Sequence, residues 1–191
     1  MTFSTRAAPG ADGSGYLSEA VAWTEPPPFP LFLEFIAEDF PDADPWLTTP
    51  LGWRPANEGD MSLPGAQVPT YPPGLPLLMA IPHAIAGIDG AVAVVIASVV
   101  IAVIATGLIA AQLGGSIAGI IAAVLIGFTP VFLHQSIQPM SDVPVTAAWM
   151  MTFSLAYRKR SFWSGLACAV AVLIRPNLAP LAVVPLFIAP K

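Results

Sequence analysis

The sequence is short of charge, of basic residues and of cysteine. Charged residues make up 10% of its 191 positions, whereas a soluble domain has about 25%. The net charge is −5 and no basic stripe occurs, which argues against a nucleic-acid partner. The single cysteine, Cys168, lies inside an apolar run. A packing role is therefore favoured over a disulfide, redox or metal role.

What the chain has instead is long uncharged apolar runs. Two of them, 91–111 and 116–133, are joined by Gly114-Gly115. As a helix the first run would be roughly 32 Å long, enough to cross a hydrocarbon core of about 30 Å. A chain of this length has too little else to cover both helices on every side. We therefore expect two transmembrane helices that form a hairpin and bring both of its ends to one side of the membrane.

Charge is divided along the chain and predicts an orientation. Residues 1–74 hold ten of the twelve acids, and the one dense basic cluster is Arg158-Lys159-Arg160, after the apolar stretch 143–157. Cytoplasmic loops collect Lys and Arg, so residues 158–160 are expected to be cytoplasmic. Counting crossings backward then places the loop 134–142 and residues 1–90 outside the cell (plasma or inner) membrane.

The expected fold class is an all-α integral membrane protein, a multi-pass helical bundle. Residues 1–90 form a long external loop with amphipathic or juxtamembrane helices, and residues 91–191 form the transmembrane helical region. The expected helices of that region cover residues 91–112, 116–134, 141–157, 162–174 and 177–190.

Within the external loop, short helices alternate with proline-rich segments. A first short helix is expected with Asp12 or Ser14 as its cap. A second, amphipathic helix is expected over 30–40, and the Pro, Gly and Asp of 41–73 exclude long regular elements. The segment 74–87 contains two prolines and too few apolar residues to span, so it is expected to be juxtamembrane or re-entrant.

Both ends of the chain suggest a longer protein. The first 15 residues have neither the basic start nor the apolar core of a signal peptide, although they are expected outside the membrane. The last residues stop within an apolar run. We therefore expect a transmembrane helix to precede Met1 in the full protein.

Four short patterns occur in an order that resembles a known family. They are Asp12-x-x-x-Tyr16, a Pro-Pro-Gly-Leu-Pro-Leu segment over 72–77, Ser141-Asp142-x-Pro144, and Ile174-Arg175-Pro176. Together they resemble the N-terminal half of GT-C superfamily glycosyltransferases, which include protein O-mannosyltransferases and aminoarabinose transferases of lipid A. The resemblance extends loosely from Asp12 to about Lys191. It departs from the family at Gly13, where many relatives have Glu.

The resemblance implies that sugar is transferred from a polyprenyl-phosphate donor to an acceptor on the external face. Asp12 then corresponds to the carboxylate of the first external loop, which serves catalysis or metal binding, and Asp142 to that of the next. Such a transfer needs a base for the acceptor hydroxyl, which typically contributes about 10²–10⁴-fold. The leaving phosphate also needs a cation. A divalent metal ion held by Asp12 and Asp142 is one candidate for that cation.

Basic and aromatic side chains are the other candidates for substrate contacts. Arg175 or Arg54 would bind the phosphate, and Tyr16, Tyr71 and Trp53 would stack on sugar faces. An arginine near membrane depth also needs a partner or an aqueous cavity. The alternative interpretation makes Arg54 a surface loop residue and the aromatic residues interfacial anchors.

The function therefore stays open between classes. The favoured hypothesis is a membrane glycosyltransferase, represented here by a fragment whose partners are membrane lipid and a polyprenyl-phosphate sugar. Broken helices with proline and an intramembrane arginine also occur in transporters, so a transporter or channel fragment is the alternative. An inactive truncated copy is a third hypothesis. The sugar, the acceptor and the oligomeric state are not determined by these patterns.

Overall fold

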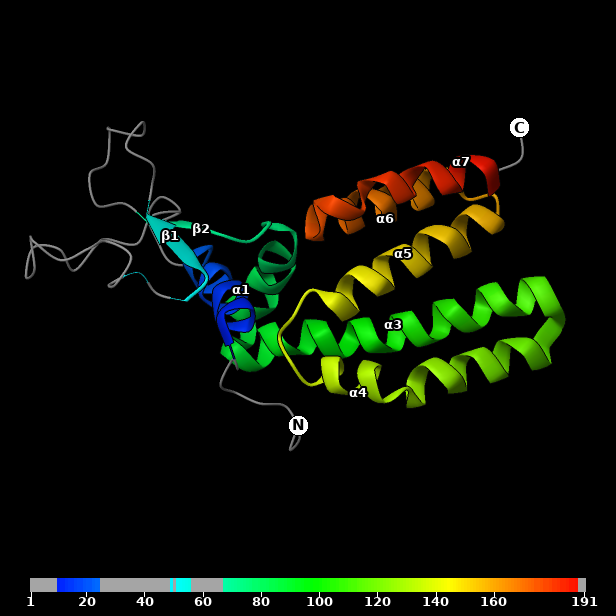
Figure 1. Cartoon of the computed structure of the whole chain (residues 1–191), viewed down its shortest axis with the longest axis horizontal. Helices are drawn as coiled ribbons and strands as arrows, with labels where there is room; N and C mark the ends of the chain where they lie inside the picture. Colours follow the sequence, from blue (N-terminus) through cyan, green and yellow to red (C-terminus); the bar gives the residue numbers. More distant parts are fainter. Residues whose placement is uncertain (1–9, 25–48, 50, 56–66, 189–191) are drawn as a thin grey trace, which may run out of the picture.

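A computed structural model describes residues 10–24, 49, 51–55 and 67–188 (Figure 1). The helix expected over 30–40 lies outside these residues. The described part is all-α except for one two-stranded hairpin. Its elements are α1 (Gly10–Ala22), β1 (Trp53–Pro55), β2 (Gln67–Pro69), α3 (Gly74–Phe128), α4 (Pro130–Ser136), α5 (Asp142–Tyr157), α6 (Ser161–Ile174), the 3₁₀ helix η2 (Pro176–Val183) and α7 (Val184–Ile188).

The long helix α3 bends at two places. The backbone leaves helical geometry at Ala86 and Gly87, and again at Gly115, where φ is +85°. Glycine adopts this left-handed region without the steric cost of a Cβ. Figure 1 shows the chain reversing at the second bend, so that α3 returns alongside itself. A Cβ added at Gly107 would lie 3.2 Å from that of Ala123, so the two arms are in close contact.

This reversal lies where the sequence predicts it, at Gly114-Gly115. Among the described helices, α3 alone combines the length and apolarity needed to cross a bilayer.

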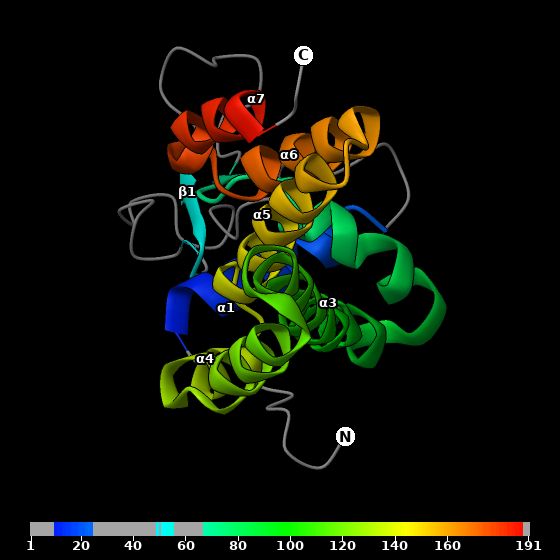
Figure 2. The same cartoon turned by 90° about the vertical axis from the view of Figure 1, so that its right-hand side faces the viewer.

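Helix α5 lies in the middle of the bundle. It packs against α3 on one side and against α6 and α7 on the other (Figure 2). Its position follows from small and uncharged side chains: Ala147 and Ala156 are buried, and so is Thr152, whose hydroxyl donates to the Ala148 carbonyl. Ser164 of α6 donates to the Thr152 carbonyl at 2.9 Å. These contacts allow α5 and α6 to approach closely.

The two ends of the bundle are built differently. At one end, here called the cluster end, α1 and the strands meet the first section of α3, the α4–α5 connection and the end of α6 (Figure 1). The opposite end, here called the basic end, contains the bend at Gly115 and the loop of residues 158–160. Leu75 and Met79 are fully buried at the cluster end.

Two helix starts differ from the sequence prediction. Helix α1 begins at Gly10, so Asp12 lies in its first turn and neither Asp12 nor Ser14 is the cap. The segment expected to be a broken juxtamembrane stretch is helical from Gly74. Pro76 lies in the first turn of that helix, where a missing N–H leaves no hydrogen bond unmade.

Two expected long helices are interrupted by proline. The run 116–134 breaks at Thr129, whose ψ of 123° is extended. The residue before a proline is pushed toward such geometry, and Pro130 opens α4. Residues 176–183 form a 3₁₀ helix instead of an α-helix. Pro180 lacks the N–H that an α-helix would donate to the Pro176 carbonyl.

Candidate functional site

Asp12 is hydrogen-bonded to a tyrosine from a different part of the chain. It lies in the first turn of α1, and its Oδ1 accepts a hydrogen bond from the Tyr71 hydroxyl at 2.5 Å. Burial, and then the neighbouring Asp12 carboxylate, raise the pKa of Tyr71 to about 12. The Tyr71 hydroxyl therefore stays protonated and acts as a donor to the acid.

Tyr16 joins α1 to the start of α5. It follows Asp12 by one helical turn, on the same face, and its hydroxyl donates to Ser141 Oγ at 3.1 Å. The rings of Tyr16 and Tyr71 lie 5.0 Å apart at 41°. Burial raises the pKa of Tyr16, the Ser141 hydrogen bond and Arg175 lower it, and the two acids Asp12 and Asp142 raise it. Both acids and the arginine are therefore within electrostatic reach of one hydroxyl.

Arg175 forms an ion pair with Asp142. The guanidinium Nη1 lies 2.7 Å from Asp142 Oδ1, and the two side chains are 36% and 31% exposed. Asp142 occupies the first turn of α5, where the helix dipole favours a carboxylate. Arg175 follows α6 at the point where Pro176 ends the helix. The partner that the sequence requires for this arginine is therefore Asp142.

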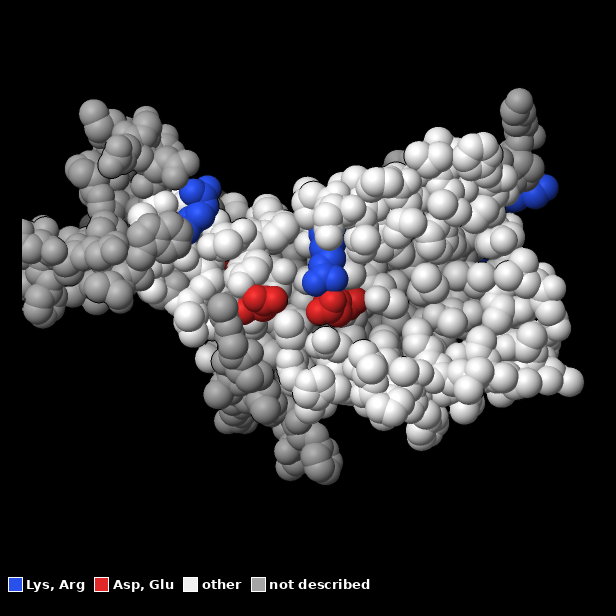
Figure 3. All heavy atoms as spheres, in the orientation of Figure 1, with Lys and Arg blue, Asp and Glu red and all other residues white. Residues whose placement is uncertain are grey.

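These contacts bring together residues from four segments of the chain. We call them the acid–arginine cluster: Asp12, Tyr16, Tyr71, Ser141, Asp142 and Arg175. In Figure 3, two acidic side chains and one basic side chain lie close together on the face shown. The surface to their right is uncharged until the far end, where basic side chains appear. The cluster offers a carboxylate and a guanidinium on one partly open surface.

Two predicted substrate contacts are not part of this cluster. Trp53 is 4% exposed, and its indole N–H donates to Ser18 Oγ at 2.8 Å. Its ring is covered and holds β1 on α1, so it does not present a face for stacking. Arg54 lies on β1 opposite Val68. No hydrogen bond or ion pair between described residues joins it to the cluster.

The cluster does not form a complete metal site by itself. No group of three acidic, histidine or cysteine side chains among the described residues is placed to hold a metal ion. Asp142 is neutralised by Arg175, whose charge would repel a cation. A metal held by Asp12 and Asp142 would need ligands from outside the described residues.

Sequence reasoning missed two polar residues of this end. Ser141 was expected only as a helix start, because its partner Tyr16 is distant in sequence. Glu19 is 2% exposed on α1; its Oε1 accepts from the Trp23 indole at 3.4 Å, and its Oε2 has no partner among the described residues. Burial raises the pKa of Glu19 to about 7. The available signal was the spacing of four residues between Glu19 and Trp23, which puts both side chains on one helix face.

What the arrangement offers chemically is a proton acceptor and a fixed cation on one surface. The described residues give Asp12 Oδ2 no partner, so that atom can accept a proton. Arg175 retains guanidinium N–H groups beyond the one that binds Asp142.

No protein-family model matches the chain, and neither a curated protein nor a solved structure matches it.

Proposed function

We propose that the chain is a multi-pass membrane protein whose cluster end carries out sugar transfer from a lipid-phosphate donor. The first support is the apolar surface of the two arms of α3. Large side chains there are widely exposed: Ile104 by 55%, Ile117 by 75% and Phe128 by 76%. Each buried apolar side chain of this size contributes roughly 1.5–3 kcal/mol relative to exposure in water. Lipid would cover this surface.

The lengths of the arms also support more than one crossing. Residues 88–114 extend roughly 40 Å as a helix, and residues 116–136, with the break at Thr129, roughly 30 Å. Each matches or exceeds a hydrocarbon core of about 30 Å. Helix α5 extends roughly 24 Å, and it lies inside the bundle instead of on its surface. Under this proposal the cluster end faces outward and the basic end faces the cytoplasm.

The observation that carries sugar transfer is the meeting of Asp12, Asp142 and Arg175 around Tyr16. Two acids that the resemblance assigns to separate external loops lie at one surface, beside a cation. This arrangement requires an even number of membrane crossings between them, as the proposed topology provides. The same arrangement offers a carboxylate as the base, Asp12, and a cation for the phosphate, Arg175.

In the proposed reaction, an acceptor hydroxyl oxygen attacks the anomeric carbon of the donor sugar. Asp12 Oδ2 takes the hydroxyl proton as the new carbon–oxygen bond forms. The bond between the anomeric carbon and the phosphate oxygen breaks, and its electron pair leaves with the polyprenyl phosphate. Arg175 faces the phosphate charge that develops. Asp142 holds the guanidinium in place, and Tyr71 fixes the orientation of Asp12.

Reconstitution in liposomes with a polyprenyl-phosphate sugar tests the reaction. We expect Asp12→Asn to lower transfer by about 10²–10⁴-fold without changing membrane insertion. Asp89→Asn is the matched control, since it removes an exposed acid that is not in the cluster; transfer should stay near the wild-type rate. Wild-type protein without transfer, or undiminished transfer by Asp12→Asn, would contradict the assignment. Sugar flux without transfer would replace it with transport.

Single-cysteine labelling tests the topology separately. In a Cys168→Ser background, Thr70→Cys and His134→Cys report on the cluster end, and Ser161→Cys reports on the basic end; all three positions are exposed. We expect an impermeant maleimide added to intact cells to label the first two and not the third. Labelling of Thr70→Cys and His134→Cys from opposite sides would overturn the proposal.

A further inference from the structure

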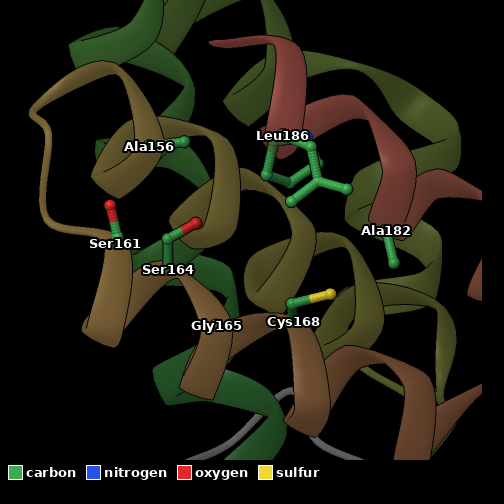
Figure 4. A pocket seen from close by; sticks show the side chains of 8 residues that line it. Ala156, Ser161, Ser164, Gly165, Cys168, Ala182 and Leu186 are labelled. Atoms are coloured by element: carbon green, nitrogen blue, oxygen red, sulfur yellow. The ribbon is translucent and has the colours of Figure 1, made fainter. Parts of the chain in front are cut away.

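A small cavity opens near the basic end, away from the acid–arginine cluster. It has a volume of about 140 Å³, and its walls come from the end of α5, the first turns of α6, η2 and α7. Figure 4 shows Cys168, Ala182 and Leu186 around the same space. The chain turns back after α6, and α6 and α7 therefore lie on opposite sides of this cavity.

The cavity suits hydrocarbon better than water. The Ser164 hydroxyl on its wall already donates to the Thr152 carbonyl at 2.9 Å, so it needs no water partner. The rest of the lining is mostly apolar, with Ala156, Cys168 and Leu186 among its residues, and pockets that bind hydrocarbon are lined mainly by apolar side chains. The space therefore suits a short length of hydrocarbon chain.

A basic turn connects two residues that line the cavity. Arg158, Lys159 and Arg160 are exposed and lie between Ala156 and Ser161, which both line the cavity. None of the three forms an ion pair with a described residue. The turn has a defined geometry because Lys159 adopts a φ of 59° and the Arg160 amide donates to the Leu155 carbonyl at 2.9 Å. It presents three positive charges beside an apolar hole.

Aromatic side chains follow the basic turn. Phe162 is 75% exposed and Trp163 is 54% exposed. Their rings pack edge to face with centroids 5.4 Å apart. Exposed aromatic residues beside Lys and Arg are typical of the cytoplasmic boundary of a membrane protein. Under the proposed membrane placement, the cavity would lie at the depth where a headgroup meets its acyl chains.

We infer that the basic turn and the cavity together bind one anionic phospholipid. Its phosphate contacts Arg158, Lys159 and Arg160, and the first part of an acyl chain enters the cavity against Cys168 and Leu186. Positive charge and an apolar hole at adjacent positions match a ligand that carries both an anion and hydrocarbon. The inference rests on the membrane placement within the proposed function and is independent of sugar transfer.

Native mass spectrometry from detergent micelles tests the binding. Delipidated protein is mixed with phosphatidylglycerol or with phosphatidylcholine of the same acyl chains. We expect about tenfold tighter retention of phosphatidylglycerol, since each basic residue near the headgroup adds attraction. The triple variant Arg158→Gln, Lys159→Gln, Arg160→Gln should retain both lipids equally, and Arg54→Gln, which removes charge elsewhere, should keep the preference. Equal retention by wild type, or an unchanged preference in the triple variant, would overturn the inference.

A second pair of measurements tests the acyl chain. Gly165→Leu should fill the cavity and weaken the binding of both lipids, because Gly165 lines it. A Cβ at Gly165 meets nothing within 4 Å, so the fold can accept the change. Phosphatidylglycerol should also slow alkylation of Cys168 by N-ethylmaleimide, whereas glycerol phosphate at the same concentration should not. Protection by glycerol phosphate, or none by lipid, would contradict the acyl-chain site. Neither measurement uses a sugar donor, so failure here is distinct from failure of sugar transfer.

Discussion

The two ends of the bundle differ in how their polar groups are held. At the cluster end, each acid is paired with a side chain from a distant segment: Asp12 with the Tyr71 hydroxyl and Asp142 with the Arg175 guanidinium. At the basic end, three neighbouring cations face solvent beside an open cavity. The first arrangement fixes side chains in one geometry, which chemistry requires. The second leaves room for a ligand that brings its own charge.

Close packing differs between the ends as well. A Cβ at Gly74, at the cluster end, would collide with the backbone of Leu173 and Ile174, whereas one at Gly165 would meet nothing within 4 Å. The first section of α3 is thus pressed against the end of α6, next to Arg175. Substitutions at the cluster end should therefore lower stability or transfer, whereas matched substitutions at the basic end should change them little.

The largest effect is expected for Arg175→Gln. This change removes the cation that faces the phosphate in the proposed reaction, and it leaves Asp142 without its partner. We expect transfer from the lipid-phosphate donor to fall by about 10²–10³-fold. Arg175→Lys should recover part of the rate, because it restores the charge without the planar guanidinium. A rate for Arg175→Gln within threefold of wild type would remove the proposed contrast between the two ends.

Gly74→Ala should have the next largest effect, through stability. The added methyl group forces the helix start away from α6, and overpacking of this kind costs about 3 kcal/mol. Thermal unfolding in detergent should then show a midpoint lower by roughly 6–12 °C. Gly165→Ala is the matched substitution at the basic end and should leave the midpoint unchanged or slightly higher. Equal losses at both positions would show that the packing does not differ.

Glu19 should make the cluster end sensitive to pH. Its pKa in the folded protein, about 7, lies above the ordinary value of 4.5, so the folded state binds more protons between these values. Stability therefore falls as pH rises from about 4.5 and levels off beyond about 7. We expect a loss of about 2 kcal/mol between pH 5 and pH 8 in wild type.

Glu19→Gln should abolish most of this pH dependence, since an amide is neutral throughout. Thermal unfolding at the two pH values measures the difference. The same slope in wild type and variant would place the titrating group elsewhere.

Short sequence patterns predicted the chain reversal in α3 and the start of α5. The reversal at Gly115 follows from two apolar runs joined by glycines, and Asp142 lies in the first turn of α5 because Ser141-Asp142-x-Pro144 is a helix-start pattern. The continuity of the helix from Gly74 was not predicted. Juxtamembrane helices were expected in this part of the chain, but the two prolines suggested a break, and the helix runs through Pro82.

The cluster itself was predicted only as a set of candidates. Sequence reasoning selected Asp12, Tyr16, Tyr71, Asp142 and Arg175 individually. Which of them pair depends on how α1 docks against α3 and α5, and no local pattern encodes that. The same limit explains why Trp53 was expected at a sugar and lies buried against Ser18. The roles of these residues in sugar transfer stay predictions.

The smallest effects are expected from Tyr→Phe substitutions. Tyrosines occur at both ends of the bundle, so the same loss of a hydroxyl can be compared between them. Tyr71→Phe removes a hydrogen bond to a carboxylate and should lower the free energy of unfolding by about 1.5 kcal/mol. Tyr16→Phe removes a hydrogen bond to the neutral Ser141 and should lower it by about 1 kcal/mol. Tyr157→Phe, at the exposed basic end, should change neither thermal unfolding nor transfer. Transfer should also fall for Tyr71→Phe, because Asp12 would lose the hydroxyl that orients it. If Tyr157→Phe cost as much as the other two, hydroxyl loss alone would explain the effects, and the cluster would have no special standing.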